Sequence, residues 1–290
     1  MSELLQFLIA GVKNGAIYAL VALGFTVVFA STGAINFAQG EFFMLGGVLG
    51  VFFLRLGLPL PVAVLAAVLA TAIIGGAFEA LAIRPLSAGD PLKIIIVTIG
   101  GSVALRQFAL HIFGPNVMII APFSSGPPIR FAGAAVERQT LWIWGLTLVT
   151  VACLAIVYQK TMLGKAMQAT SLSHDGARLM GIDTKKMVTV AFVLSAALGA
   201  VAGLAVTPLT QTAFDVGAGI GVKGFTAAIL GGLGNPLATV CGGIVLGLLE
   251  SLAAGYFDPL YKDAVALVVL LGVLFVRPSG LAGLMRRGRG

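Results

Sequence analysis

Long apolar stretches separated by short polar connections run through this 290-residue chain and limit its fold more than any other feature. A helix needs about 20 predominantly apolar residues to cross the hydrocarbon core of a bilayer. Nine candidate spans can be delimited, at residues 14–30, 36–54, 60–83, 94–113, 140–158, 187–207, 217–233, 236–257 and 262–276. Only 10% of the residues are charged, against roughly a quarter in soluble domains. The composition therefore argues against a water-soluble enzyme and predicts an all-α polytopic membrane protein.

The distribution of basic residues predicts how the chain crosses the membrane. Basic connections stay in the cytoplasm, so the net charge of +7 does not require a nucleic-acid partner. Nine of the 18 Lys and Arg lie in the connection 159–186 and in the tail, namely Lys160, Lys165, Arg178, Lys185, Lys186, Arg277, Arg286, Arg287 and Arg289. Both segments are expected inside, which places the C-terminus in the cytoplasm and the N-terminus outside. Arg130, Arg138 and Lys262 then fall on the outer side.

Parity fixes the number of spans. Two points on the same side of a membrane are joined by an even number of crossings, yet only three full-length segments lie between the connection 159–186 and the tail. Residues 217–233 must therefore also cross, as a broken or re-entrant span. We expect about eight transmembrane helices plus this broken span, in one domain over residues 1–290.

Two candidate spans, around residues 31–47 and 215–232, contain polar and charged side chains among glycines, and both end in Leu-Gly-Gly. This is a weak internal repeat. Unwound backbone is tolerated at membrane depth only where protein or a water-filled cavity satisfies it, and broken helices at corresponding places in two halves are typical of a substrate pathway. The candidate pathway residues are Asn36, Gln39, Glu41, Asp215, Gly219 and Lys223.

Close helix packing through small residues is the alternative role for the glycines, as in Gly242, Gly243 and Gly247. For the glycines alone packing is favoured. The neighbouring ionisable groups favour a cavity, because charges at that depth are costly without water or a partner.

The other charged residues within the spans receive simpler interpretations. Glu79 precedes Arg84 by five residues near the end of its span, where both can reach the interface and form an ion pair. Glu250 is expected to pair inside the bundle. Arg106 and His111 share one span, and we assign them no functional role.

Motifs for catalysis, metals and cofactors are missing from the sequence. No Gly-x-x-x-x-Gly-Lys-Ser/Thr loop, His-Glu-x-x-His, Cys-x-x-Cys or Gly-x-Ser-x-Gly occurs. The two cysteines, Cys153 and Cys241, lie in apolar runs and are expected to be inert. The chain is therefore not expected to be an enzyme or to hold a metal or cofactor, but a partner that hydrolyses ATP could move it.

The basic connection contains a candidate docking element for such a partner. Ser173 can cap a short helix over residues 174–180, and Gly181 suits its C-terminal end. The helix would present one basic and two apolar side chains, Arg178, Leu179 and Met180. Either a partner's groove grips it or it is an ordinary solvated connector, and the connection alone favours neither.

Several stretches together resemble the membrane permease subunits of branched-chain amino acid ABC transporters. The stretch from Asn14 to Thr26 is similar to the family's opening helix, and Gly33 to Glu41 is similar to its Asn-Phe-Ala-x-Gly stretch. Further matches are Glu79 with Arg84-Pro85-Leu86, Thr98-Ile99-Gly100, Gly231-Gly232-Leu233-Gly234, Gly242-Gly243 and Glu250. The resemblance covers essentially the whole chain and implies an ABC permease bundle.

The resemblance also implies partners and a mechanism. Such permeases work with two ATP-binding subunits, a second homologous permease, usually as a heterodimer, and an extracytoplasmic substrate-binding protein. They dock on the ATPases through a Glu-Ala-Ala-x-x-x-Gly segment, to which residues 175–181 are similar in spacing although two of the first three positions differ. The ATPase-coupling residues are then Asp175, Ala177, Arg178, Leu179 and Gly181.

The sequence leaves other functions open. Related permeases carry urea or short amides, and more distant ones carry sugars, which would need more polar and aromatic pathway groups. An intramembrane enzyme would need a nucleophile with its base or paired acids, whereas Glu41, Glu79 and Glu250 are separated in sequence. A passive channel would need no ATPase. The favoured hypothesis, which the resemblance implies, is alternating access in the cytoplasmic (inner) membrane with branched-chain or other neutral amino acids as substrates.

Overall fold

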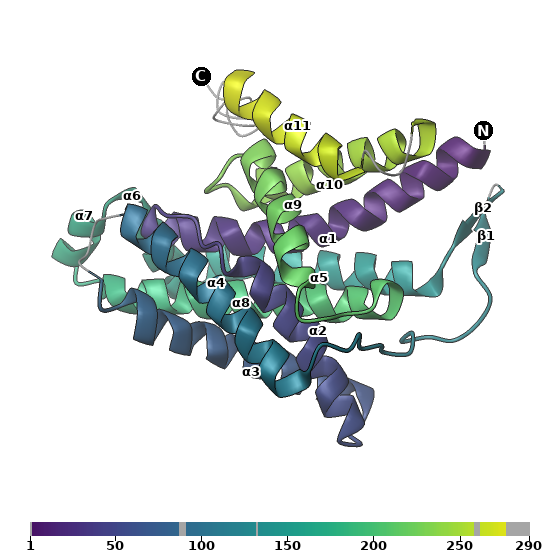
Figure 1. The fold of residues 1–290 in the computed structure, drawn as a ribbon. Helices are drawn as coiled ribbons and strands as arrows, with labels where there is room; N and C mark the ends of the chain where they lie inside the picture. The colour runs from purple at the N-terminus through teal and green to yellow at the C-terminus, as the bar shows by residue number, and fades with distance from the viewer. Residues whose placement is uncertain (1, 87–90, 132, 258–261, 277–290) are drawn as a thin grey trace.

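The computed structural model describes residues 2–86, 91–131, 133–257 and 262–276. Figure 1 shows a bundle of helices with one small hairpin. The elements are α1 (Ser2–Thr32), α2 (Gln39–Arg55), α3 (Leu60–Phe78), the π-helix η1 (Glu79–Ile83), α4 (Pro91–Phe113), β1 (Ile129–Phe131), β2 (Ala134–Val136), α5 (Arg138–Lys160), α6 (Met162–Leu172), α7 (His174–Leu179), α8 (Thr184–Thr210), α9 (Val216–Gly231), α10 (Pro236–Tyr256) and α11 (Lys262–Val276). The basic tail expected in the cytoplasm lies outside the described residues.

Each of the nine expected spans has a helix in the structure. Six helices are long and apolar enough to cross a membrane: Glu3–Thr32, Leu60–Ile83, Pro91–Phe113, Arg138–Lys160, Thr184–Thr210 and Pro236–Tyr256. The other three are shorter, with 17 residues in α2, 16 in α9 and 15 in α11. The predicted all-α polytopic fold is confirmed. The antiparallel pair β1–β2 is an addition that the apolar pattern did not predict.

Glycines allow the two inner helices α1 and α10 to pack backbone to backbone. A Cβ at Gly247 would overlap the backbone nitrogen of Gly15, and one at Gly243 would lie 2.6 Å from the backbone nitrogen of Ala19. Between the same two helices the hydroxyls of Thr26 and Thr239 hydrogen-bond at 2.9 Å. Close approach through small residues is a usual basis of helix association in membranes, so these glycines do what the packing interpretation predicts.

Two short non-helical segments, called breaks below, interrupt the helices inside the bundle. Residues 33–38 separate α1 from α2, and residues 211–215 separate α8 from α9. The first residue of α2, Gln39, donates to the backbone oxygen of Ser195 at 3.1 Å, and Ser195 lies near the middle of α8. A Cβ at Gly40 would overlap the carbonyl of Gly217 in the first turn of α9. Both short helices therefore begin side by side, with the start of α2 buried and the start of α9 partly exposed.

The two ends of the bundle carry different structures. Figure 1 places α6 and α7 at one end, and the N-terminus with β1 and β2 at the other. The side chain of Gln6 makes two hydrogen bonds to the backbone of Ala135, which ties the hairpin to α1. The first end is named below the α7 end, and it also holds η1, the last turn of α1 and the first turn of α8.

Candidate functional site

The break between α1 and α2 is built by Gly33 and Asn36. Gly33 has a φ of +68°, a left-handed conformation that glycine adopts without strain, and it ends α1. The side-chain oxygen of Asn36 accepts a hydrogen bond from the backbone N–H of Ala38 at 3.1 Å, an Asx-turn that starts α2. Asn36 is fully buried, and its amide nitrogen has no partner among the described residues.

Gln39 and Glu41 point from the first turn of α2 toward two different helices. Gln39 is held by Ser195 of α8, whose hydroxyl donates to the side-chain oxygen of Gln39. Glu41 is 1% exposed. Its Oε1 accepts hydrogen bonds from Ser102 Oγ at 2.9 Å and from Arg106 Nη2 at 2.7 Å. Both partners belong to α4, so the two side chains connect α2 with α8 on one side and with α4 on the other.

The face of α4 toward this break is a polar stripe. Thr98, Ser102 and Arg106 follow one another at intervals of four residues, which places them on one face of a helix. The hydroxyl of Thr98 accepts from the backbone N–H of Phe37 at 3.2 Å. The rest of α4 is little covered, since only 11% of its most apolar window is buried. The polar stripe therefore attaches α4 to the bundle together with the apolar contacts of Leu105, Ala109 and Phe113.

The predicted residues of the second glycine segment lie apart from one another. Asp215 is exposed and makes no side-chain cap to α9, and Gly219 faces open space. Lys223 contacts Glu250 and lies 2.7 Å from Asp263 Oδ1. Glu250 is fully buried and also accepts from the hydroxyl of Tyr18. The pairing of Glu250 inside the bundle is as predicted, and it ties α9 to α1, α10 and α11.

The structure thus divides the six predicted pathway residues into two sets. Asn36, Gln39 and Glu41 gather at the start of α2, while Lys223 belongs to the Glu250 cluster further along α9. Gly217, in the first turn of α9, packs against the first set: a Cβ at this position would lie 2.6 Å from Glu41 Oε2. Sequence reasoning missed Ser102 and Arg106, although their spacing with Thr98 is a readable signal.

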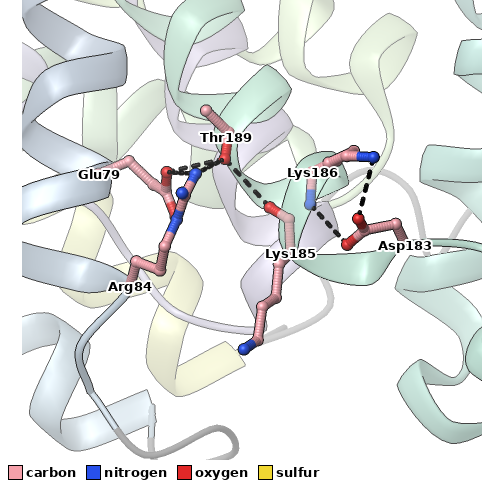
Figure 2. Close-up of polar contacts among 6 residues, drawn as sticks. All are labelled: Glu79, Arg84, Asp183, Lys185, Lys186 and Thr189. Atoms are coloured by element: carbon pink, nitrogen blue, oxygen red, sulfur yellow. Dashed lines mark hydrogen bonds and ion pairs between the residues drawn. The ribbon is translucent and has the colours of Figure 1, made fainter.

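At the α7 end, Glu79 and Arg84 form the predicted ion pair. Figure 2 shows Arg84 and Thr189 converging on the Glu79 carboxylate, with Arg84 Nη2 at 3.3 Å and Thr189 Oγ1 at 2.8 Å. Thr189 belongs to α8, so this cluster ties η1 to α8.

Beside that cluster, Asp183 caps α8. Its side-chain oxygen accepts from the backbone N–H of Lys186 at 3.2 Å (Figure 2). This hydrogen bond, followed by the side-chain contact and positive charge of Lys186, holds the pKa of the Asp183 carboxyl below its usual range.

Helix α7 spans His174–Leu179, one residue shorter than the predicted helix over 174–180. The side-chain oxygen of Ser173 accepts from the backbone N–H of Gly176 at 3.0 Å. At the other end Gly181 has a φ of +80°, its N–H donates to Arg178 O at 2.9 Å, and the N–H of Ile182 donates to Ala177 O at 3.0 Å. This pair of bonds is a Schellman motif. The helix is thus fixed at both ends, with Ala177 buried and Leu179 89% exposed.

A cavity of about 390 Å³ lies between α7, η1 and the starts of α4 and α8. Its walls are mixed, with Arg84, Arg178, Lys185 and Glu79 among the charged lining residues and Ile83, Ile94 and Val188 among the apolar ones. Among the described residues, no group of three His, Cys, Asp or Glu side chains could hold a metal ion.

Comparison with known proteins supplies the family. Residues 7–274 match the family model described as the permease component of the branched-chain amino acid transport system. This chain belongs to that family. The match reaches from α1 into α11, so the fold described above is that of a family member throughout.

The sequences of known permease proteins align with this chain along nearly its full length. It is 32% identical to the high-affinity branched-chain amino acid transport system permease protein LivH of Salmonella typhimurium, covering 96% of this chain and 95% of that protein. It is 33% identical to BraD of Pseudomonas aeruginosa, with the same coverage. A probable LivH of Methanocaldococcus jannaschii is 26% identical over 91% of this chain and 88% of its own length. These relatives are described as permease proteins, not as enzymes.

Proposed function

We propose that this chain is the membrane-spanning permease subunit of an ABC importer that carries branched-chain or other neutral amino acids across the cytoplasmic membrane. The observation that carries the proposal is the family match over residues 7–274. Separate subunits would hydrolyse the ATP, since the sequence has no phosphate-binding loop. The urea alternative gains no support from the relatives, whose descriptions name branched-chain amino acids.

The substrate pathway in this proposal passes the starts of α2 and α9. Two helices that begin side by side within the bundle direct two helix N-termini, each with a partial positive charge, at one place. Broken helices in transporters place such ends at the substrate. Asn36, Gln39 and Glu41 would form the α2 side of the pathway. Asp215, Gly219 and Lys223 would form the α9 side, on which Gly219 and Asp215 are exposed.

The coupling site in this proposal is α7 with its caps. Asp175, Ala177, Arg178, Leu179 and Gly181 would form the element that the ATPases grip. Support comes from the caps at both of its ends and from the exposed apolar residues Leu179 and Met180, at 89% and 82%. A solvated connector has no need of two exposed apolar side chains on a helix capped at both ends.

The assembly in this proposal contains two ATP-binding subunits, a homologous permease subunit as a heterodimer partner and an extracytoplasmic substrate-binding protein. The α7 end faces the cytoplasm together with the C-terminus, and the N-terminus faces outward, because the basic residues of the connection 159–186 gather at the α7 end. Exposed apolar side chains on α4, including Ile96, Val103 and Phe108, suit contact with lipid or with the second permease.

Reconstitution of the complete transporter tests the proposal. Proteoliposomes containing this chain, its partner permease, the two ATPases and the binding protein should accumulate labelled leucine or alanine when ATP is supplied to the ATPase side. Urea serves as the competing substrate. Uptake of urea alone, or amino-acid uptake that does not depend on ATP, would contradict the proposal.

A further inference from the structure

Unpartnered polar atoms gather at the start of α2. In the part of the chain that the structure describes, six buried side-chain atoms lack a hydrogen-bond partner. Three of them are Asn36 Nδ2 in the α1–α2 break, Glu41 Oε2 in the first turn of α2 and Arg106 Nε in the polar stripe of α4. Buried polar groups in native proteins are nearly always paired, and exceptions need a physical reason. Glu41 and Arg106 contact each other, so a shared reason can be sought for their two atoms.

The geometry of the ion pair between Glu41 and Arg106 explains why two of these atoms lack a hydrogen-bond partner. A guanidinium and a carboxylate can join through two parallel hydrogen bonds. Here one bond is made, from Arg106 Nη2 to Glu41 Oε1 at 2.7 Å, and Ser102 Oγ donates to the same Oε1 at 2.9 Å. One acceptor, Oε2, and one donor, Nε, are left over. The pair as a whole is neutral and still offers both a negative and a positive contact.

We infer that this unmatched pair recognises the charged head group of the transported amino acid, an inference that rests on the proposed function. Glu41 Oε2 accepts from the α-ammonium group, and Arg106 Nε donates to the α-carboxylate. A zwitterion adds no net charge to a neutral pair. An amine or a carboxylic acid alone would bring an unbalanced charge to membrane depth, which is costly. The site therefore selects α-amino acids by charge arrangement, whatever their apolar side chain.

Access to the site depends on α4. Glu41 is 1% exposed, whereas the Arg106 side chain is 27% exposed, so the site is closed from the α2 side and reaches the surface on the α4 side. Helix α4 is poorly covered, so a displacement of α4 from α2 opens the site; it also shifts the apolar contacts of Leu105, Ala109 and Phe113 with the core cluster of α2. The contacts that bind the amino acid are thus among the contacts that hold α4, which couples binding to movement.

Thermal unfolding of the purified transporter complex, without the binding protein, tests the inference. A ligand that binds the folded state raises the melting temperature, and a tighter ligand raises it more at the same concentration. The probes are leucine, 3-methylbutylamine, which lacks the carboxylate, and 4-methylpentanoate, which lacks the ammonium. In the wild type, leucine should stabilise more than either analogue.

Two conservative variants assign the contacts. Glu41→Gln keeps the shape and Oε1 but removes the charged acceptor, so leucine should lose its advantage over 4-methylpentanoate. Arg106→Lys keeps the charge but removes Nε, so leucine should lose its advantage over 3-methylbutylamine. In each variant we expect the dissociation constant for leucine to rise about tenfold to a hundredfold, as for a lost hydrogen bond to a charged group. Glu79→Gln changes the same kind of pair at the α7 end and should leave the discrimination intact.

The outcomes separate this inference from the proposed function. If wild-type uptake of leucine is ATP-dependent but both variants discriminate the three probes as the wild type does, the unpartnered atoms are structural and the inference is wrong. It is equally wrong if Glu79→Gln abolishes discrimination as strongly as Glu41→Gln. If wild-type uptake fails altogether, the proposed function is contradicted first. Loss of discrimination in the two site variants alone confirms the inference.

Discussion

Helices α1 and α4 are both apolar enough to cross a membrane, yet they are held in the bundle by different forces. In its most apolar window α1 is 83% buried, while α4 is 11% buried. Helix α1 packs through glycines directly against the backbone of α10. Helix α4 is attached by the polar stripe of Thr98, Ser102 and Arg106 and by a few apolar residues, among them Ala109. Backbone contact between α1 and α10 leaves little room for a relative shift, whereas α4 makes few contacts, so the comparison separates a fixed core from a sparsely packed helix.

The largest effect is expected from a change inside the fixed core. In Gly247→Leu the new side chain would overlap the backbone of Gly15, so α1 and α10 must separate. Changes that force packed helices apart fall among the exceptional cases, above about 4 kcal/mol of unfolding free energy. We expect loss of monodisperse protein in fluorescence-detected size-exclusion chromatography. Gly100→Leu on α4, where nothing lies within 4 Å of a Cβ, is the matched control and should behave as the wild type. Equal behaviour of both variants would refute the distinction.

A smaller effect is expected where charge, instead of backbone contact, holds a helix. Lys223→Met leaves Glu250 buried beside Tyr18 without its nearest cation, and breaking a buried pair from one side costs about 3–5 kcal/mol. The melting temperature in detergent should fall clearly. Lys262 is 3.9 Å from the same carboxylate and is 40% exposed, so Lys262→Met should change it little. A larger fall in melting temperature from Lys262→Met than from Lys223→Met would show that Lys262, not Lys223, is the main cation paired with Glu250.

The sequence predicted features that depend on neighbouring residues and missed those that depend on distant ones. Ser173 and Gly181 sufficed to place α7, because caps are local interactions. The Glu79 and Arg84 pair was predictable for the same reason. Glu41 and Arg106 are 65 residues apart, and no local rule joins them.

In the candidate site, the sequence did not show which residues from distant segments contact one another. The apolar segments each correspond to a helix, and the glycine segment 31–47 contains the first break, at 33–38. The second break, at 211–215, precedes the glycines of residues 215–232, which lie in the continuous helix α9. Neither pattern shows that α2 and α9 begin beside each other. That contact depends on the packing of α8, which precedes α9 in the chain and contacts α2 through Ser195. The polar stripe of α4 was readable as a pattern at intervals of four, but without its partner across the bundle it had no meaning.

An effect on coupling without an effect on the fold is expected at α7. In Gly181→Pro the φ of +80° is forbidden and the N–H that bonds Arg178 O is lost. The Schellman motif then fails, and α7 loses its fixed end. We expect ATP-dependent uptake to fall at least about tenfold, while the melting temperature of the bundle stays near the wild-type value because the motif lies outside the packed helices. Arg178→Glu should also lower uptake, because it reverses a charge on the helix that the ATPases are proposed to contact. Unchanged uptake in both variants would reject α7 as the coupling element.

The smallest effect is a pH dependence at the exposed cap of α8. The pKa of Asp183 is lowered in the folded chain, first by the backbone N–H of Lys186, so folding favours its ionised form. Its contribution is therefore complete above the ordinary Asp value of about 3.9 and is lost as pH falls through the lowered pKa of the folded state. Asp183→Asn keeps a capping oxygen but cannot titrate. Between about pH 5 and 3 the melting temperature of the wild type should fall slightly more steeply than that of Asp183→Asn, and equal slopes would mean that the cap makes no net contribution. Because the cap is exposed and the Glu41 pair is buried, the two sites also offer a direct comparison: the same kind of carboxylate is a minor stabiliser at the surface and a candidate recognition group in the core.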